Sequence, residues 1–216
     1  MNVNRRKIQA NHNSIEYTYL KSNSRTICFM FSGSGYNYDK PLFYYATMTM
    51  LQNKIDIVHM HYAYEKDLLS KPLEEITRTM IDDINPVISD VLKNNQYDEV
   101  IFLGKSLGTI PIVNDLMKRE GFFTATVILL TPLLNFDSIL DSIVNSRHRG
   151  LLVIGDKDHF YNPDQVDHLG ISKLQIELVQ NANHSLDIGQ YETTNSILAL
   201  SKVMGKIQET IDGITK

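Results

Sequence analysis

The sequence predicts an α/β protein in which a mostly parallel sheet carries helices on both faces. Short apolar runs typical of strands alternate with longer segments of helical periodicity. The run at residues 26–32 is almost unbroken in its apolar character, as in strands buried on both faces. A chain of 216 residues with 43% hydrophobic side chains can bury one sizeable core. We therefore expect a single domain over residues 1–216.

The first half of the chain contains four expected strands and two expected helices. The strands fall at residues 7–10, 14–20, 26–32 and 55–62. Polar residues 11–13 suit a hairpin turn between the first two strands. The first helix is expected at residues 41–53, with Pro41 at its start. A long amphipathic helix begins at Pro72 and should bend near Pro86, because proline cannot donate the helical hydrogen bond.

The second half repeats the alternation of strands and helices. Strands are expected at residues 99–103, 125–130, 151–154 and 174–179. Helices are expected at residues 107–118, 137–144, 163–169 and 191–211. Strands that alternate with helices pair in parallel through right-handed crossovers, so the carboxyl ends of these strands meet at one edge of the sheet.

The stretch from Gly104 to Gly108, Gly-Lys-Ser-Leu-Gly, marks a sharp turn from strand to helix. Glycines two residues before and after Ser106 suit a strained backbone with positive φ that exposes the serine hydroxyl. The N–H of Leu107, at the start of the helix, could then donate to a negative oxygen beside Ser106. A plain turn with a serine helix cap is the alternative. A phosphate-binding loop is excluded, because Glu99 stands where that motif requires glycine.

A serine nucleophile needs a base, and the base needs an acid that orients it. His184 follows the strand at residues 174–179, and Asp158 follows the strand at residues 151–154. Both would therefore reach the edge of the sheet where Ser106 lies. Asp156 is the alternative acid, although it suits a cap of the turn. His159 is expected to be a loop side chain that does not face Asp158.

These motifs, with the order serine, aspartate, histidine, resemble the α/β-hydrolases. The resemblance implies a three-layer sandwich with a mostly parallel eight-strand sheet, whose first strands are antiparallel, and a minimal cap or none. It also implies a Ser106–His184–Asp158 triad. The loop Ser32-Gly33-Ser34-Gly35 is similar to the family's His-Gly-x-Gly loop, with Ser32 in place of histidine. This likeness makes Ser34, with Leu107, the expected oxyanion hole.

The expected substrate pocket is open and shallow. Many α/β-hydrolases carry a lid after the sixth strand, and residues 131–150 leave room for only one short helix there. Loop residues at the carboxyl edge of the sheet would line the pocket, and their apolar character suggests an acyl or aromatic group. Besides Leu107 they are Tyr36, Tyr38, Pro132, Leu133 and Phe160. Each of them could instead pack beneath the loops.

The expected function is a serine hydrolase that cleaves a carboxylic ester or thioester through an acyl-enzyme. An acyltransferase, or a peptidase or C–C hydrolase, would use the same triad, because the fold does not fix the leaving group. A non-catalytic ligand-binding homologue is the alternative of another class. Lys105, beside the serine, could orient an anionic group, or it could be a solvated or locally paired lysine.

No metal or organic cofactor is expected, and the expected partner is a small-molecule ester or thioester substrate. His59 and His61 alternate on one strand, but the sequence suggests no third ligand, so a packed or hydrogen-bonded role is favoured. A net charge of −4 and a pI near 6.0 give no basic field for nucleic acid. No apolar run is long enough to span a membrane. The single cysteine, Cys28, and the absence of a signal-like N-terminus favour a cytoplasmic protein.

Overall fold

The computed structural model describes residues 1–10, 14–64, 67–93 and 95–214, and within them eight strands form one sheet. The strands are β1 (Asn2–Gln9), β2 (Ser14–Lys21), β3 (Thr26–Phe31), β4 (Asp56–His61), β5 (Glu99–Lys105), β6 (Thr126–Leu130), β7 (Gly150–Gly155) and β8 (Leu174–Val179). Their order in the sheet is β1-β2-β4-β3-β5-β6-β7-β8. β2 pairs antiparallel with β1 and β4, and the pairs from β4 to β8 are parallel. The expected fold class is confirmed.

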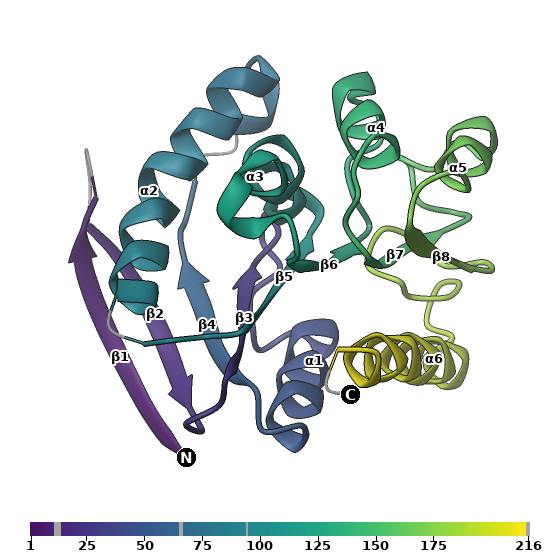
Figure 1. The fold of residues 1–216 in the computed structure, drawn as a ribbon. Coiled ribbons are helices and arrows are strands. Elements are labelled where there is room, and N and C mark those ends of the chain that lie inside the picture. The colour runs from purple at the N-terminus through teal and green to yellow at the C-terminus, as the bar shows by residue number, and fades with distance from the viewer. Residues whose placement is uncertain (11–13, 65–66, 94, 215–216) are drawn as a thin grey trace.

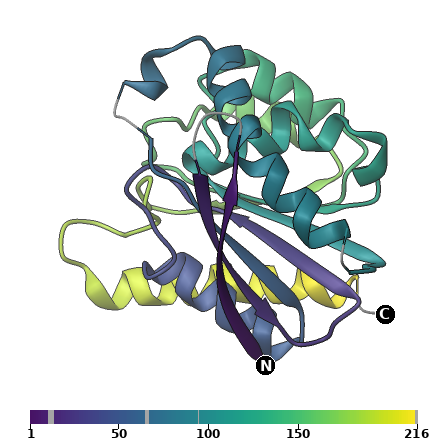
Figure 2. The ribbon, with the colours of Figure 1, turned by 90° about the vertical axis from the view of Figure 1, so that its left-hand side faces the viewer.

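Six α-helices in the described residues cover the two faces of this sheet. They are α1 (Pro41–Gln52), α2 (Leu73–Lys93), α3 (Thr109–Asn114), α4 (Asp137–Val144), α5 (Pro163–Leu169) and α6 (Thr193–Asp212). Helices α2, α3, α4 and α5 lie on one face, and α1 and α6 lie on the other (Figure 1). The view turned by 90° also separates α1 and α6 from α2 across the sheet (Figure 2). The sheet and its two helical layers therefore form the expected three-layer sandwich.

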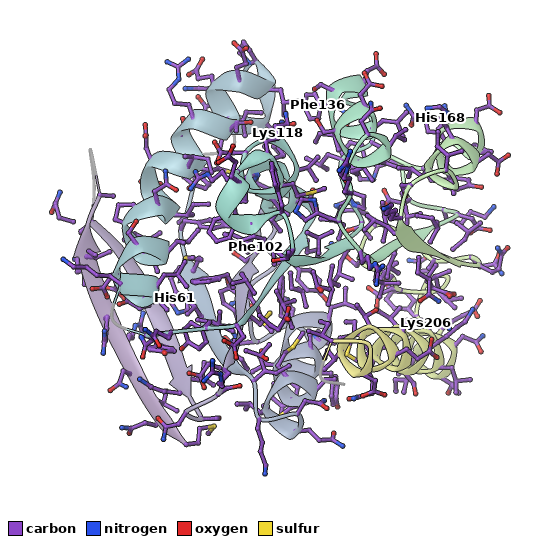
Figure 3. The ribbon with its side chains drawn as sticks, viewed as in Figure 1. His61, Phe102, Lys118, Phe136, His168 and Lys206 are labelled. Atoms are coloured by element: carbon purple, nitrogen blue, oxygen red, sulfur yellow. The ribbon has the colours of Figure 1, made fainter. Side chains whose placement is uncertain are left out.

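Each face of the sheet has its own apolar core. On one face, side chains of α2 to α5 pack on the sheet around Phe102, which is labelled at the centre of Figure 3. The Phe102 ring lies 5.0 Å from that of Phe122 and 6.1 Å from those of Phe29 and Phe31. On the other face, Phe43 of α1 and Val203 of α6 lie in the second cluster. Cys28 is fully buried there, which raises the pKa of its thiol.

The first expected strand differs in its bounds from the observed one. β1 begins at Asn2 rather than at residue 7, because backbone pairing with β2 extends from Asn2 opposite Lys21. This edge strand is mostly exposed, so its first residues carry no apolar alternation that the sequence could reveal. The expected hairpin turn at residues 11–13 lies outside the described residues. α2 is a continuous helix that contains Pro86.

The helix after Ser106 is shorter than expected. Instead of one helix over residues 107–118, a 3₁₀ turn at Ser106–Gly108 leads into α3, and a second 3₁₀ turn follows at Leu116–Lys118. The break falls at Asp115, whose φ of −134° leaves the helical region. Leu116 and Met117 are then buried in the core beside α3.

Gly108 is required for space and not for an unusual backbone conformation. Its φ is −65°, but a β-carbon there would lie 2.1 Å from the carbonyl oxygen of Phe31. The end of β3 would have to move, so Gly108→Ala should lower the free energy of unfolding by about 3 kcal/mol or more. Urea denaturation followed by circular dichroism measures this change.

Gly205→Ala is the matched control, because a β-carbon at this α6 position meets nothing within 4 Å. Its helical propensity should raise stability by roughly 0.5–1 kcal/mol. Equal stability of Gly108→Ala and the wild-type protein would contradict the close packing of β3 on this turn.

Candidate active site

Ser106 lies where β5 turns into the 3₁₀ turn before α3. Its φ is +51°, the strained left-handed conformation that the flanking glycines favoured in the sequence. The Ser106 carbonyl accepts a 2.7 Å hydrogen bond from the Thr109 hydroxyl, which fixes the turn. A β-carbon on Gly33 would lie 3.4 Å from Cβ of Ser106, so the loop after β3 passes directly beside the serine.

His184 and Asp158 meet Ser106 from the loops that follow β8 and β7. His184 Nε2 lies 2.9 Å from Ser106 Oγ, and His184 Nδ1 lies 2.8 Å from Asp158 Oδ2. The Asp158 side chain is fully buried, whereas 23% of the His184 side chain is exposed. This chain of hydrogen bonds orients an imidazole between a serine hydroxyl and a buried carboxylate, which is the arrangement that can activate a serine.

Asp156, the alternative acid, lies elsewhere in the same loop. Its Oδ1 accepts a 2.6 Å hydrogen bond from the N–H of Asn181, so it ties the loop after β7 to the turn after β8. The second oxygen of Asp158 accepts the N–H of Phe160 at 2.9 Å. Of the two carboxylates, it is Asp158 that is hydrogen-bonded to His184.

The expectation for His159 is wrong in part. Its side chain is 65% exposed, as a loop residue would be, but its Nδ1 lies 3.7 Å from Asp158 Oδ1. Its ring centre also lies 5.0 Å from that of His184. The short turn after β7 brings the ring back over the carboxylate of the preceding residue, which residue spacing alone did not indicate.

A cavity of about 300 Å³ adjoins the expected oxyanion hole. Ser34 and Leu107 both line it, together with the loop after β4. The structure adds lining residues that the sequence analysis missed, namely Tyr62, Tyr64, Leu68 and Leu69. They follow a parallel strand at its carboxyl end, so the rule that selected Asp158 and His184 would also have found this segment.

Besides Leu107, which lines this cavity, two of the expected pocket residues lie close to the site. Tyr36 lines both the cavity beside Ser34 and a second hollow of about 490 Å³ along the loop after β8. The Phe160 ring lies 5.2 Å from the His184 ring. Both side chains are partly buried.

The other three expected pocket residues pack beneath the loops. The Tyr38 hydroxyl lies between the carbonyls of Met30 and Met60, within hydrogen-bond distance of both, and its ring stacks on His59, so Tyr38 belongs to the core. Leu133 is buried in the core cluster under α4, and Pro132 beside it is also buried. Apolar loop residues serve the core as readily as a pocket, and only packing separates these roles.

Lys105 is neither solvated nor paired with a carboxylate at the surface. Only 1% of it is exposed. Its Nζ donates to the carbonyl of His184 at 2.9 Å and to the hydroxyl of Thr131 at 3.1 Å. It also lies 4.6 Å from the centre of the Tyr36 ring. Burial lowers the pKa of Lys105 to about 8, and the nearby carboxylates of Asp158 and Asp187 oppose this fall.

His59 and His61 have the packed roles that the sequence favoured. His59 is hydrogen-bonded to Thr47 at 2.9 Å, and His61 to Thr18 at 2.7 Å. Burial lowers the pKa of His59 to about 3, which keeps it neutral.

In the described residues, one group of metal-ligating side chains lies close together, and it is Asp158, His159 and His184. Two of these three already hold the hydrogen bonds around Ser106. Both oxygens of Asp158 accept hydrogen bonds, from His184 and from the Phe160 N–H. The hydrogen-bonded chain that ends at Ser106 therefore accounts for Asp158 and His184 in this cluster.

Residues 24–212 match the family described as the alpha/beta hydrolase domain. The chain belongs to this family. The match covers both the Ser106 turn and the loops that carry Asp158 and His184. Residues 131–150 of this α/β-hydrolase hold α4 and no other helix, which agrees with the expected minimal cap. Membership supports a hydrolase.

Solved structures with the same fold cover nearly the whole chain. Est1E from Butyrivibrio proteoclasticus is 14% identical with a TM-score of 0.72, over 98% of this chain and 99% of that one. An α/β serine hydrolase without a lid from Xanthomonas campestris is 13% identical with a TM-score of 0.72, over 98% and 94%. The Pyrococcus furiosus esterase Pf2001 is 11% identical with a TM-score of 0.68, over 97% and 93%. At such identities the likeness concerns the fold alone.

No curated protein sequence matches this α/β-hydrolase. Among its described residues, no helix combines the length and the apolar character needed to cross a bilayer.

Proposed function

We propose that this α/β-hydrolase cleaves small carboxylic esters or thioesters through an acyl-enzyme on Ser106. The observation that carries the proposal is the hydrogen-bonded chain from Ser106 Oγ through His184 to Asp158, with distances of 2.9 Å and 2.8 Å. The esterase from Pyrococcus furiosus and the serine hydrolase from Xanthomonas campestris share the fold. A structure of Est1E with bound ferulic acid shares it too.

In the proposed reaction, Ser106 Oγ attacks the carbonyl carbon while Nε2 of His184 takes the hydroxyl proton. Asp158 holds the proton on Nδ1 of His184 and stabilises the imidazolium that forms. The N–H groups of Leu107 and Ser34 stabilise the oxyanion. Protonated His184 then gives its proton to the leaving alcohol or thiol. Water attacks the acyl-enzyme with His184 again as base, and the acid is released.

The acyl group would occupy the cavity beside Ser34 and Leu107. This cavity adjoins the expected oxyanion hole, so a carbonyl oxygen placed there directs its substituent along Tyr62 and Leu68. At about 300 Å³ it lies at the small end of ligand pockets. The leaving group would point toward the second hollow, lined by Tyr36, Asp187 and Ile188.

A panel of p-nitrophenyl esters of increasing acyl length tests this proposal. We expect kcat/KM to be highest for acyl groups of up to about eight carbons and to fall by about tenfold or more at palmitoyl, because a sixteen-carbon chain is too long for a cavity of about 300 Å³. A fluorophosphonate probe should label the protein, and peptide mapping should locate the label on Ser106. Folded protein that neither turns over these esters nor takes the label would overturn the proposed function.

A further inference from the structure

Lys105, the residue directly before Ser106, has no role in the reaction proposed above. Lys105 directly precedes Ser106 at the end of β5, yet its ammonium does not reach solvent. A buried ammonium is costly unless hydrogen bonds and charges compensate for its lost hydration. The partners of Lys105 therefore indicate what its burial achieves.

Those partners come from three different loops around the site. The carbonyl of His184 belongs to the loop after β8, and the hydroxyl of Thr131 lies directly after β6. The ring of Tyr36 belongs to the loop after β3, which also carries Ser34. One ammonium thus joins the serine turn to the loop of the base and to the loop of the expected oxyanion hole.

The contact with His184 is to its backbone, so it fixes the position of the residue and leaves the imidazole free to exchange protons. Its ring nitrogens are already directed at Ser106 and Asp158. Thr131 has a φ of +45°, an unfavourable conformation for a β-branched residue. Lys105 donates a hydrogen bond to the hydroxyl of this strained residue, at the edge of the site.

We propose that Lys105 is a positioning residue whose buried ammonium holds the His184 loop and the Tyr36 loop in register with Ser106. The inference rests on the proposed hydrolytic function. Loss of the ammonium would let the backbone of His184 move, and a misplacement of about 1 Å can cost about 100-fold in rate.

The charge of Lys105 also predicts how the activity depends on pH. Its pKa of about 8 lies below the ordinary 10.5, because burial disfavours the ammonium. The charged groups that face it are the carboxylates of Asp158 and Asp187, and both favour the ammonium. Below pH 8 the ammonium holds both loops, and as the pH rises through about 8 this hold is lost. Activity should therefore fall above about pH 8.

The effect of the Lys105 charge on stability has the opposite pH dependence to its effect on activity. A lysine whose folded-state pKa is below its unfolded value opposes folding while it is charged, and this cost disappears as the pH rises from 8 to 10.5. Retention of such a group beside a nucleophile is typical of a functional role. A merely structural residue would be expected to stabilise the fold.

Lys105→Met, which keeps the length of the side chain and removes the charge, tests the inference. We expect kcat for p-nitrophenyl acetate to fall by about 100-fold, with KM changed by less than about threefold. The fall in activity above about pH 8 should disappear. Lys173→Met, at an exposed position, is the matched control and should retain wild-type kcat and the wild-type pH profile.

Thr131→Val provides a second test that does not depend on the folding of Lys105→Met. It keeps the branched shape, removes one acceptor of the ammonium and should move the alkaline fall to lower pH. Wild-type kcat in folded Lys105→Met, or an alkaline fall that neither variant changes, would overturn the role of Lys105. These results are distinct from failure of the proposed function, in which the wild-type protein neither turns over esters nor takes the fluorophosphonate label.

Discussion

Ser106→Ala is expected to reduce kcat for p-nitrophenyl butyrate by on the order of 10⁴-fold or more and to abolish fluorophosphonate labelling. The Ser106 hydroxyl is hydrogen-bonded to Nε2 of His184, so its loss removes the nucleophile and the hydrogen bond to the base. Steady-state assays of the purified variant measure kcat, and mass spectrometry of the probe-treated protein measures the labelling.

The fold should tolerate this change, because the strain of Ser106 lies in its backbone and alanine adopts the same conformation. A circular dichroism melt therefore accompanies the assay. Ser201→Ala, an exposed serine on α6, is the matched control and should keep wild-type rates. A folded Ser106→Ala protein that still labels and turns over at the wild-type rate would show that Ser106 is not the nucleophile.

The second large effect is expected for Asp158→Asn. The carboxylate accepts the Nδ1 proton of His184 at 2.8 Å and so leaves Nε2 free to take the proton of Ser106. An amide can donate to Nδ1 instead, which places the proton on Nε2, where it blocks proton transfer. We expect kcat to fall by on the order of 10⁴-fold with little change in structure.

Asp156→Asn is the matched comparison, two residues earlier in the same loop. Its amide oxygen can still accept the N–H of Asn181, so activity should remain within about threefold of wild type. The pair decides between the two candidate acids. A larger loss for Asp156→Asn than for Asp158→Asn would reverse their assignment.

Much of this molecule follows from local sequence patterns. Apolar runs such as β3 and β6 are buried on both faces of a parallel sheet, where hydrophobic burial dominates. Strand termini were predicted to within a few residues, except in β1. This edge strand is held by backbone hydrogen bonds to β2, which side-chain composition does not report.

In the candidate site, too, some residues could be predicted from the sequence and others could not. Ser106, Asp158 and His184 follow parallel strands, so the topology alone directs them to one edge of the sheet. The same rule does not say whether an apolar side chain at that edge faces a pocket or the core. Tyr38 and Leu133 are buried, while Tyr62 and Leu68 line the cavity beside Ser34.

The fold class, the strained serine turn and the order of the three residues behind their strands all follow from the amino-acid sequence alone. These features depend on periodicity, glycine spacing and chain direction, which are local properties. The surroundings of Lys105 depend on tertiary contacts, because the residues that bury its side chain come from loops far away in the sequence. Burial of one ammonium against Thr131, Tyr36 and the backbone of His184 requires segments far apart in the chain, and no local pattern encodes that meeting.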